Sequence, residues 1–336
     1  MKKVIVTGIN GLIGQYITEP LKDLGFEVYG IGTKYIKTTE FNYIKTDINN
    51  ANKLRKIFNK IEAKYLVHLA WDMNDLNSNN HFKLLASSIN MLDCFKECGG
   101  KKAVYIGTCF EYKYKTSPLK ENDKLNPTTI YAKCKNYLRE ISELYCDKNN
   151  IDFCWARIFY TYGKNENNKR LFPQIINGLK NNQKVSINHS QLKRDYMFAG
   201  DVAKAIALIL NSKFKGIINI CGGKAISLKD FALTIAKNMN KENLLELNEL
   251  YTNEPKIIVG DNSKLIKEIK FNKFKTLQEN CEEKRREEKR REFLQLIAYI
   301  LQLIFINVNT LLIKNMESMR HEYIRNEYRR SLYNSK

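Results

Sequence analysis

The sequence lacks the residue pairs that staple or metallate small domains. No two of its eight cysteines form a Cys-x-x-Cys pair, and its four histidines stand far apart, none at ligand spacing with a cysteine. Because structural zinc sites are built from such paired ligands, we expect no metal site. The first residues, MKKVIVTG, also lack the hydrophobic stretch and cleavage site of a signal peptide. These absences predict a reduced, cytoplasmic protein with free thiols.

Acidic residues are in short supply: 56 lysines and arginines stand against 36 aspartates and glutamates, a formal net charge of +20. Residues 276–336 hold 12 basic and 9 acidic residues, so +17 of this charge is spread over residues 1–275, mostly as single lysines. Nucleic-acid-binding proteins gather basic residues in a patch or stripe. The dispersed pattern favours solvated faces and predicts no nucleic-acid partner, while it is compatible with an anionic small substrate.

Short apolar segments alternate with helical patterns through the first 160 residues. We expect strands at KVIVT, EVYGIG, YLVHLA, AVYIGT and DFCWARIF, and helices over residues 11–23, 50–61, 79–98 and 129–148. Such alternation is typical of βαβ units, in which helices cover both faces of a parallel sheet. The sequence predicts an α/β fold with a Rossmann-type doubly wound sheet, which binds ligands at the carboxyl ends of its strands.

The alternation loosens after residue 163, where we expect helices over residues 170–180, 200–212 and 227–239 and a strand over residues 216–220. We predict three parts. They are a dinucleotide-binding domain (residues 1–162), a smaller α/β substrate lobe interleaved with it (residues 163–275) and a helical tail (residues 276–336). No proline-, glycine- or serine-rich linker marks the first boundary.

The tail runs from a charged segment, EEKRREEKRRE (282–292), into an apolar one, FLQLIAYILQLIFINVNTLLI (293–313). An apolar helix of this length, about 31 Å, would suffice to span a bilayer core of about 30 Å. Gln295, Gln302 and Asn309 recur every seven residues, however, and place a polar stripe on one face. The stripe favours a helix that packs on protein, as in a homodimer, or lies on a membrane surface. A true span and a tail without a role are the alternatives.

A glycine-rich turn, GINGLIG (residues 8–14), follows the first expected strand. Gly8 permits a tight turn, Gly11 lets the backbone approach a pyrophosphate, and Gly14 allows close helix packing. The N-terminus of the next helix favours phosphate charge. We expect a dinucleotide to be bound there by Gly8, Asn10, Gly11, Leu12, Ile13 and Gly14.

The end of the second expected strand holds Thr33 and Lys34 and no carboxylate. An acidic residue at this place binds the adenosine ribose of NAD, whereas a cation accommodates the 2′-phosphate of NADP. NADP is therefore favoured over NAD, with an ordinary exposed lysine as the alternative interpretation of Lys34.

Tyr131 and Lys135 stand four residues apart on an expected helix and so share a face. A free phenol has a pKa of about 10, which an adjacent ammonium and a cationic nicotinamide would lower. Lys135 can also hold the nicotinamide ribose. Thr108, at the end of a strand 23 residues before Tyr131, completes a candidate catalytic set, although it could simply cap that strand.

With these motifs, residues 1–278 resemble the extended short-chain dehydrogenases/reductases of the nucleotide-sugar epimerase/dehydratase family. The resemblance assigns the catalytic hydroxyl, tyrosine and lysine to Thr108, Tyr131 and Lys135. It assigns further cofactor contacts to Asp47 and Ile48 on the adenine side and to Leu69 and Ala70, which together with His68 match the H-L-A strand end of the family.

The resemblance implies an enzyme that uses NAD(P) and acts at C4 of a nucleotide-diphosphate sugar, in the synthesis of cell-surface glycan precursors. Tyr131 would take or give the proton of a sugar hydroxyl while hydride passes between that carbon and the nicotinamide. Arg194 would grip the diphosphate with its permanently charged, planar fork. The implied substrate-side residues are Thr108, Cys109, Phe110, Tyr160, Phe172 and Arg194.

Family members that are 4,6-dehydratases carry Asp-Glu after the catalytic hydroxyl residue, as acid and base. Cys109 and Phe110 occupy those positions here, so dehydration is disfavoured and a 4-epimerase or 4-ketoreductase is expected. Two alternatives remain open. One is a reductase or dehydrogenase of a non-nucleotide carbonyl substrate, and the other is a dinucleotide-sensing protein of this fold without turnover.

Overall fold

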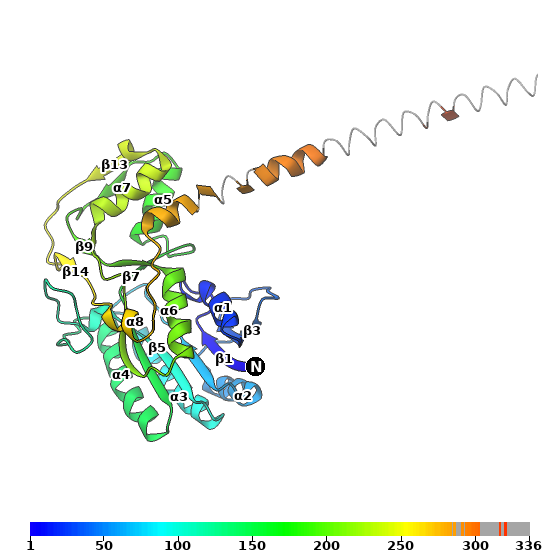
Figure 1. The fold of residues 1–336 in the computed structure, drawn as a ribbon, viewed down its shortest axis with the longest axis vertical. Coiled ribbons are helices and arrows are strands. Elements are labelled where there is room, and N and C mark those ends of the chain that lie inside the picture. The colour runs from blue at the N-terminus through cyan, green and yellow to red at the C-terminus, as the bar shows by residue number, and fades with distance from the viewer. Residues whose placement is uncertain (284, 287–289, 292, 303–315, 317–318, 321–336) are drawn as a thin grey trace, which may run out of the picture. The chain divides into compact units, whose positions relative to one another are not determined.

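The computed structural model describes residues 1–283, 285–286, 290–291, 293–302, 316 and 319–320 (Figure 1). Residues 1–280 form one compact unit and residues 281–336 form another. Each unit is described by itself.

A seven-stranded sheet lies at the centre of residues 1–280, with the strand order β11-β6-β5-β4-β1-β2-β3 and parallel pairing throughout. The chain runs outward from β1 through β2 and β3, then returns to β4 and runs the other way. The strand order therefore reverses at β1 and β4. Doubly wound sheets bind ligands in a crevice at the carboxyl ends of the two strands where the order reverses. The strands are β1 (Lys2–Thr7), β2 (Phe26–Gly32), β3 (Asn42–Lys45), β4 (Tyr65–His68), β5 (Lys102–Thr108), β6 (Asp152–Ile158) and β11 (Gly216–Ile220).

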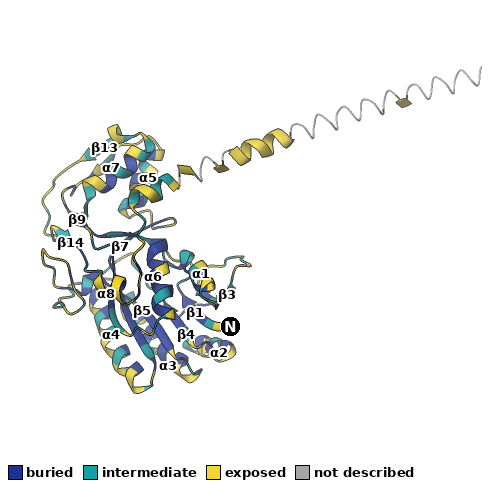
Figure 2. Ribbon diagram, viewed as in Figure 1, coloured by how far each residue is buried: buried dark blue, intermediate teal, exposed yellow. Residues whose placement is uncertain are grey.

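Helices cover both faces of this sheet. On one face lie α1 (Gly14–Asp23) and α6 (Ala199–Asn211), and on the other lie α2 (Ala51–Ile61), α3 (Asn80–Glu97) and α4 (Ile130–Lys148). Successive side chains of a strand point to opposite faces, and β1 shows it: Val4 and Val6 join the core with α1 and α6, while Ile5 joins the other core. Figure 2 shows the buried strands between the two helical layers. The predicted Rossmann-type fold is confirmed.

The expected strands and helices of the first 160 residues are present, with two differences. The helix expected from residue 11 begins at Gly14, because residues 8–13 are used by the glycine turn. The edge strand β3 was not expected, since its sequence, NYIK, is short and has no fully buried residue.

The later residues add α5 (Leu171–Lys180), α7 (Leu228–Met239) and α8 (Ser263–Lys267) and a set of strands of two or three residues. Those strands are β7 (Tyr160–Tyr162), β8 (Val185–Ile187), β9 (Lys193–Arg194), β10 (Tyr196–Phe198), β12 (Ile226–Ser227), β13 (Leu245–Leu247) and β14 (Ile257–Ile258). Their segments are too short to show a period in the sequence. Because β11 joins the central sheet beside β6, the second region shares the sheet of the first, and the division at residue 162 stays a prediction.

Part of the tail is described. Residues 277–283 and 293–302 are helical, and the side chains of 293–302 are exposed. Residues 303–313, the rest of the apolar segment, and five residues of the charged segment lie outside the described residues. None of the helices in the described part of the chain is long and apolar enough to cross a membrane.

Candidate active site

The glycine-rich turn connects β1 to α1 at the carboxyl edge of the sheet. Gly8 has a φ of +71°, and a Cβ atom there would lie 2.6 Å from the backbone nitrogen of Ala70. A Cβ atom at Gly14 would lie 2.3 Å from the Gly8 carbonyl oxygen, so neither position accepts a larger residue. The turn thereby brings the start of α1 close to Leu69 and Ala70, which follow β4.

The N-terminus of α1 is open to a ligand. Ile13 occupies its N-cap and makes no side-chain capping hydrogen bond within the described chain. Asn10 and Gly11 are exposed, and Leu12 is half-buried. Free backbone N–H groups and the helix dipole favour an anion at such a place. The turn and its cradle of glycines therefore fit the pyrophosphate of a dinucleotide.

Thr33 and Lys34 follow β2 and are both exposed. The Lys34 carbonyl oxygen accepts hydrogen bonds from Asn10 Nδ2, at 3.5 Å, and from the Tyr43 hydroxyl. These bonds tie the end of β2 to the glycine turn. The Lys34 backbone thus lies next to the turn, at the end of β2, where a ribose 2′-phosphate would need a cation.

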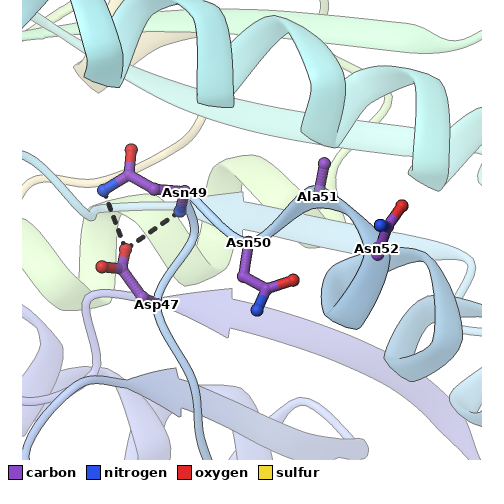
Figure 3. A pocket seen from close by; sticks show the side chains of 5 residues that line it. All are labelled: Asp47, Asn49, Asn50, Ala51 and Asn52. Atoms are coloured by element: carbon purple, nitrogen blue, oxygen red, sulfur yellow. Dashed lines mark hydrogen bonds between the residues drawn. The ribbon is translucent and has the colours of Figure 1, made fainter.

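Asp47 and Ile48 follow β3. The Asp47 carboxylate accepts hydrogen bonds from the backbone nitrogen and from Nδ2 of Asn49, both at 2.9 Å. Figure 3 shows this carboxylate turned toward Asn49 in a pocket that is also lined by Asn50, Ala51 and Asn52. Ile48 is buried in the core. Asp47 therefore shapes the turn that starts α2, and its contact with an adenine stays a prediction.

His68 ends β4 and links three elements. Its Nδ1 lies 2.7 Å from the Thr7 hydroxyl oxygen and its Nε2 lies 2.8 Å from that of Ser88. Because Ser88 donates to the Leu84 carbonyl, His68 carries its proton on Nε2 and accepts from Thr7. Burial and the Lys135 ammonium hold the pKa of His68 well below its ordinary value, so it is a neutral structural group. Among the described residues, no group of three or more His, Cys, Asp or Glu could hold a metal ion.

Tyr131, on α4, lies close to Thr108, at the end of β5, whose hydroxyl group lowers the pKa of the phenol. The two residues are buried, with 4% and 5% of their surfaces exposed. Burial raises the pKa of Tyr131 above its ordinary value, and the effect of Thr108 only partly opposes it. The expected lowering of this pKa by Lys135 is not found, because the loss of hydration dominates.

Lys135 lies one turn along α4 from Tyr131, and its side chain reaches β5 and Trp71. Its Nζ donates to the Ile106 carbonyl at 2.8 Å and lies 3.8 Å from the centroid of the Trp71 ring. Burial lowers the pKa of Lys135 to about 7, although the Glu111 carboxylate opposes this shift. No pattern in the sequence indicated Trp71 at this place.

A buried ion pair fixes Thr108 from behind. Glu111 accepts hydrogen bonds from the backbone nitrogen of Thr108, at 2.8 Å, and from Trp155 Nε1 and Arg157 Nε. Glu111 and Arg157 are almost fully buried, and their charged atoms lie 2.7 Å apart. Thr108 and Glu111 form a capping box around a short 3₁₀ helix, Cys109–Glu111. The Thr-x-x-Glu spacing is the sequence signal that could have found this support.

A row of aromatic rings extends from Tyr131 through Phe110 and Tyr160 to Tyr196. The Phe110 ring centroid lies 6.3 Å from that of Tyr131 and 6.0 Å from that of Tyr160. Tyr160 continues the row to Tyr196, with 5.5 Å between ring centroids. Phe110 and Tyr160 thus lie in one row with Tyr131, and their contact with a substrate stays a prediction.

Cys109 and Phe172 are both buried, and Phe110 and Tyr160 of this row pack against the cluster that contains Cys109. Cys109 belongs to an apolar cluster with Leu119 and Phe159, and burial raises the pKa of its thiol. Phe172 packs on Tyr162, with 5.2 Å between ring centroids. Both side chains support the site from the core, and their contact with a substrate stays a prediction.

Arg194 is buried next to Tyr160, with its guanidinium carbon 5.6 Å from the ring centroid. Its Nη1 donates to the carbonyls of Lys193 and Pro255, and its Nη2 donates to Glu254 Oε2 at 2.7 Å. The arginine therefore lies next to the aromatic row. The half-exposed Glu254 carboxylate binds one end of the guanidinium group that was expected to bind a diphosphate. Its role as a diphosphate ligand stays a prediction.

Two charged residues of the site carried no signal in the sequence. Arg170, the N-cap residue of α5, donates to the Met73 carbonyl at 3.1 Å and lies close enough to Tyr131 to lower the pKa of its phenol. Glu166 lies between β7 and α5, and its Oε2 is buried. Both residues fall in the polar segment KNENNKR, which looks like an ordinary loop.

Known proteins resemble the chain over these same parts. The profile of the NAD dependent epimerase/dehydratase family matches residues 4–221. The dTDP-6-deoxy-L-talose 4-dehydrogenase (NAD(+)) of Aggregatibacter actinomycetemcomitans is 27% identical over 235 residues, which cover 67% of this chain and 86% of that protein. The dTDP-D-glucose 4,6-dehydratase of Dictyostelium discoideum is 24% identical over 270 residues, which cover 70% of this chain and 62% of that protein.

Solved structures share the fold. The structure of UDP-glucose 4-epimerase of Thermotoga maritima with UDP-glucose matches with a TM-score of 0.75 and 17% identity, covering 83% of this chain and 96% of that one. The family match spans most of the chain and includes the glycine turn, the Tyr131–Thr108 pair and Lys135. The resemblance seen in the motifs is thereby confirmed: the chain belongs to the NAD dependent epimerase/dehydratase family, among whose members are nucleotide-sugar epimerases and dehydratases.

Proposed function

We propose that the chain acts at C4 of a nucleotide-diphosphate sugar by hydride transfer, as a 4-epimerase or a 4-ketoreductase, with Thr108, Tyr131 and Lys135 as its catalytic set. The observation that carries this proposal is the close approach of two buried residues with hydroxyl groups, Tyr131 and Thr108, at the carboxyl end of β5. It brings two hydroxyl groups together at the place where this fold binds ligands. A sugar oxygen between them could accept from one and donate to the other.

A nicotinamide dinucleotide fits the chain at the glycine turn, and when bound it supplies hydride exchange with the sugar carbon. The proton is the task of the protein. Oxidation at C4 requires a base for the hydroxyl proton, and reduction of a 4-keto group requires an acid for the new hydroxyl. Tyr131 would serve both directions, and Thr108 would hold the same oxygen. The raised pKa of Tyr131 keeps its phenol protonated at neutral pH, which suits delivery of a proton to a 4-keto oxygen.

Dehydration is disfavoured by the two residues after Thr108. Loss of water from a sugar needs an acid and a base in addition to the tyrosine. Cys109 is a buried thiol with a raised pKa, and Phe110 has no ionisable group. The similarity to a dehydratase is therefore no reason to assign dehydration to this chain.

The choice of cofactor rests on Lys34. Its side chain is exposed and its backbone lies next to the glycine turn, which suits a 2′-phosphate, so we propose NADP over NAD, while the family as a whole is NAD-dependent. An NADP preference would itself suit a reductase.

One observation favours a second candidate function, a reductase or dehydrogenase of a non-nucleotide carbonyl substrate. Arg194 already pairs with Glu254, and a substrate without a diphosphate would leave that pair intact. The complete set of Thr108, Tyr131 and Lys135 speaks against a protein that only senses a dinucleotide.

The test is a screen of the purified full chain against UDP-, GDP-, CDP- and dTDP-sugars with each nicotinamide cofactor, read by nicotinamide absorbance and by product identity. We expect one nucleotide series to be epimerised or reduced at C4. Turnover of simple carbonyl compounds without any nucleotide sugar would favour the second candidate. The homodimer, the cytoplasmic location and a membrane-surface contact through residues 293–313 stay predictions.

A further inference from the structure

Residues 163–170 connect β7 to α5 and are anchored on both sides of the ligand crevice. On the α1 side, the Lys164 backbone nitrogen donates to the Tyr16 hydroxyl at 3.1 Å, and Asn165 Nδ2 donates to Gln15 Oε1 at 2.9 Å. On the β4 side, Asn167 Nδ2 donates to Asn74 Oδ1 at 2.7 Å. Since α1 follows β1 and Asn74 follows β4, this segment crosses between the two strands whose ends form the crevice.

Glu166 stands between these anchors with one carboxylate oxygen unused. The backbone N–H group of Gly163 lies close enough to its carboxylate to lower the pKa of Glu166. Its Oε2 is buried and receives no hydrogen bond from any residue that the structure describes. Buried polar atoms in native proteins nearly always have a partner, so an orphan of this kind requires an explanation.

The surroundings of Glu166 are those of the active site. Arg170 lies close enough to lower the pKa of both Glu166 and Tyr131, which puts the carboxylate in the same electrostatic environment as the catalytic phenol. Glu166 in turn acts on Tyr196, whose ring continues the aromatic row through Tyr160 toward Tyr131. Aromatic rings beside a small number of polar groups are the usual lining of a small-molecule site.

We propose that Glu166 recognises the hexose of the substrate by accepting a hydrogen bond from one of its hydroxyl groups at Oε2. The inference rests on the proposed function and assigns a specificity role to a residue outside the catalytic set. An ionised carboxylate only accepts hydrogen bonds, and a hydroxyl group is the donor that a sugar offers. A diphosphate would be repelled by the same charge, so Glu166 faces the sugar end of the substrate.

Burial agrees with this assignment, because it raises the pKa of Glu166 to about 7 against the opposing effects of Arg170 and the Gly163 N–H group. A carboxylate held in this way lacks hydration, and a substrate hydroxyl would restore a hydrogen bond that water no longer provides.

The variant that tests the proposal is Glu166→Gln. Glutamine keeps the shape of the side chain but has one acceptor atom in place of two. Its single side-chain oxygen can face the Gly163 N–H group or the substrate hydroxyl group, and not both. The matched control is Glu268→Gln, at an exposed glutamate at the end of α8.

The measurement is calorimetric titration of the full chain, with NADP present, against UDP-, dTDP-, CDP- and GDP-glucose and against the four free nucleoside diphosphates. We expect Glu166→Gln to weaken binding of the preferred nucleotide sugar about tenfold, the loss of one charge-assisted hydrogen bond. Its affinity for the matching nucleoside diphosphate should stay within about twofold of the parent, and Glu268→Gln should change neither affinity.

Unchanged affinity of Glu166→Gln for the nucleotide sugar would overturn the proposal. So would equal weakening of the sugar nucleotide and the free diphosphate, since the residue would then act on the diphosphate or on the fold. A variant that fails to fold would show that both oxygens are structural, with the same consequence. If the parent chain binds no nucleotide sugar at all, the proposed function itself fails, which the parent titration alone reveals.

Discussion

The ammonium of Lys135 lies 3.8 Å from the centroid of the Trp71 ring and donates a hydrogen bond to the Ile106 carbonyl. A cation held against an aromatic face and one carbonyl has lost most of its hydration, and its pKa falls to about 7. Packing thus fixes the lysine one helical turn from Tyr131, and neutral pH is close to the pH at which its ammonium group loses its proton.

This environment makes the stability of the fold depend on pH. Lys135 has a folded pKa of about 7 against an ordinary lysine pKa of 10.5, so the unfolded chain binds its proton more tightly. The group therefore destabilises the fold at pH 7, and this effect fades as the pH rises toward 10.5. We expect Lys135→Met to be more stable than the parent at pH 7 and to lose that advantage by pH 10.

Urea unfolding of both proteins at the two pH values measures this difference. Lys133→Met, at an exposed lysine on the same helix, should show no such change with pH. A difference between Lys135→Met and the parent that is constant from pH 7 to pH 10 would contradict the burial of the ammonium.

Tyr131→Phe should lower turnover by about two to four orders of magnitude, the range of general acid–base catalysis, and leave cofactor binding intact. The change removes the phenol hydroxyl, which lies close to Thr108, whereas the ring itself keeps its packing in the variant. Steady-state kinetics and fluorescence titration with the cofactor separate the two effects. The control is Tyr137→Phe, at an exposed tyrosine of the same helix, and normal activity of Tyr131→Phe would end the catalytic assignment.

Lys34→Ala should weaken binding of NADPH by about fivefold, as expected for one exposed ion pair, and leave NADH almost unaffected. The change removes the exposed cation of a residue whose backbone lies next to the glycine turn. Titration with both reduced cofactors at low salt is the measurement, and Lys37→Ala, at another exposed lysine, is its control. Equal effects on the two cofactors would remove the predicted preference for NADP.

Deletion of the chain after residue 280 should leave a folded protein, because residues 1–280 form a compact unit of their own. Thermal unfolding of the truncated chain, followed by circular dichroism, should show one cooperative transition. Analytical ultracentrifugation of both lengths would show whether the tail holds a homodimer together. Loss of cooperative unfolding would disprove a peripheral role for the tail.

The sequence predicted the sheet and its ligand edge well, because long apolar segments and a glycine turn depend on local chemistry. It missed β3, whose four residues are partly exposed at an edge, and the strands of two or three residues, which show no period. In the site, spacing along one helix sufficed for Tyr131 and Lys135. Trp71 and Glu166 reach the site only through contacts between distant segments, and no local pattern reports such contacts.

The most direct test of hydride chemistry at C4 is the fate of a deuterium placed at that carbon of the preferred nucleotide sugar. Incubation with the full chain and its cofactor, followed by NMR and mass spectrometry, locates the label. Hydride transfer at C4 predicts that deuterium returns to C4 in the epimer or passes to the nicotinamide as the 4-keto sugar forms. Deuterium at C6, the outcome of dehydration, would contradict it. So would recovery of every labelled nucleotide sugar unchanged.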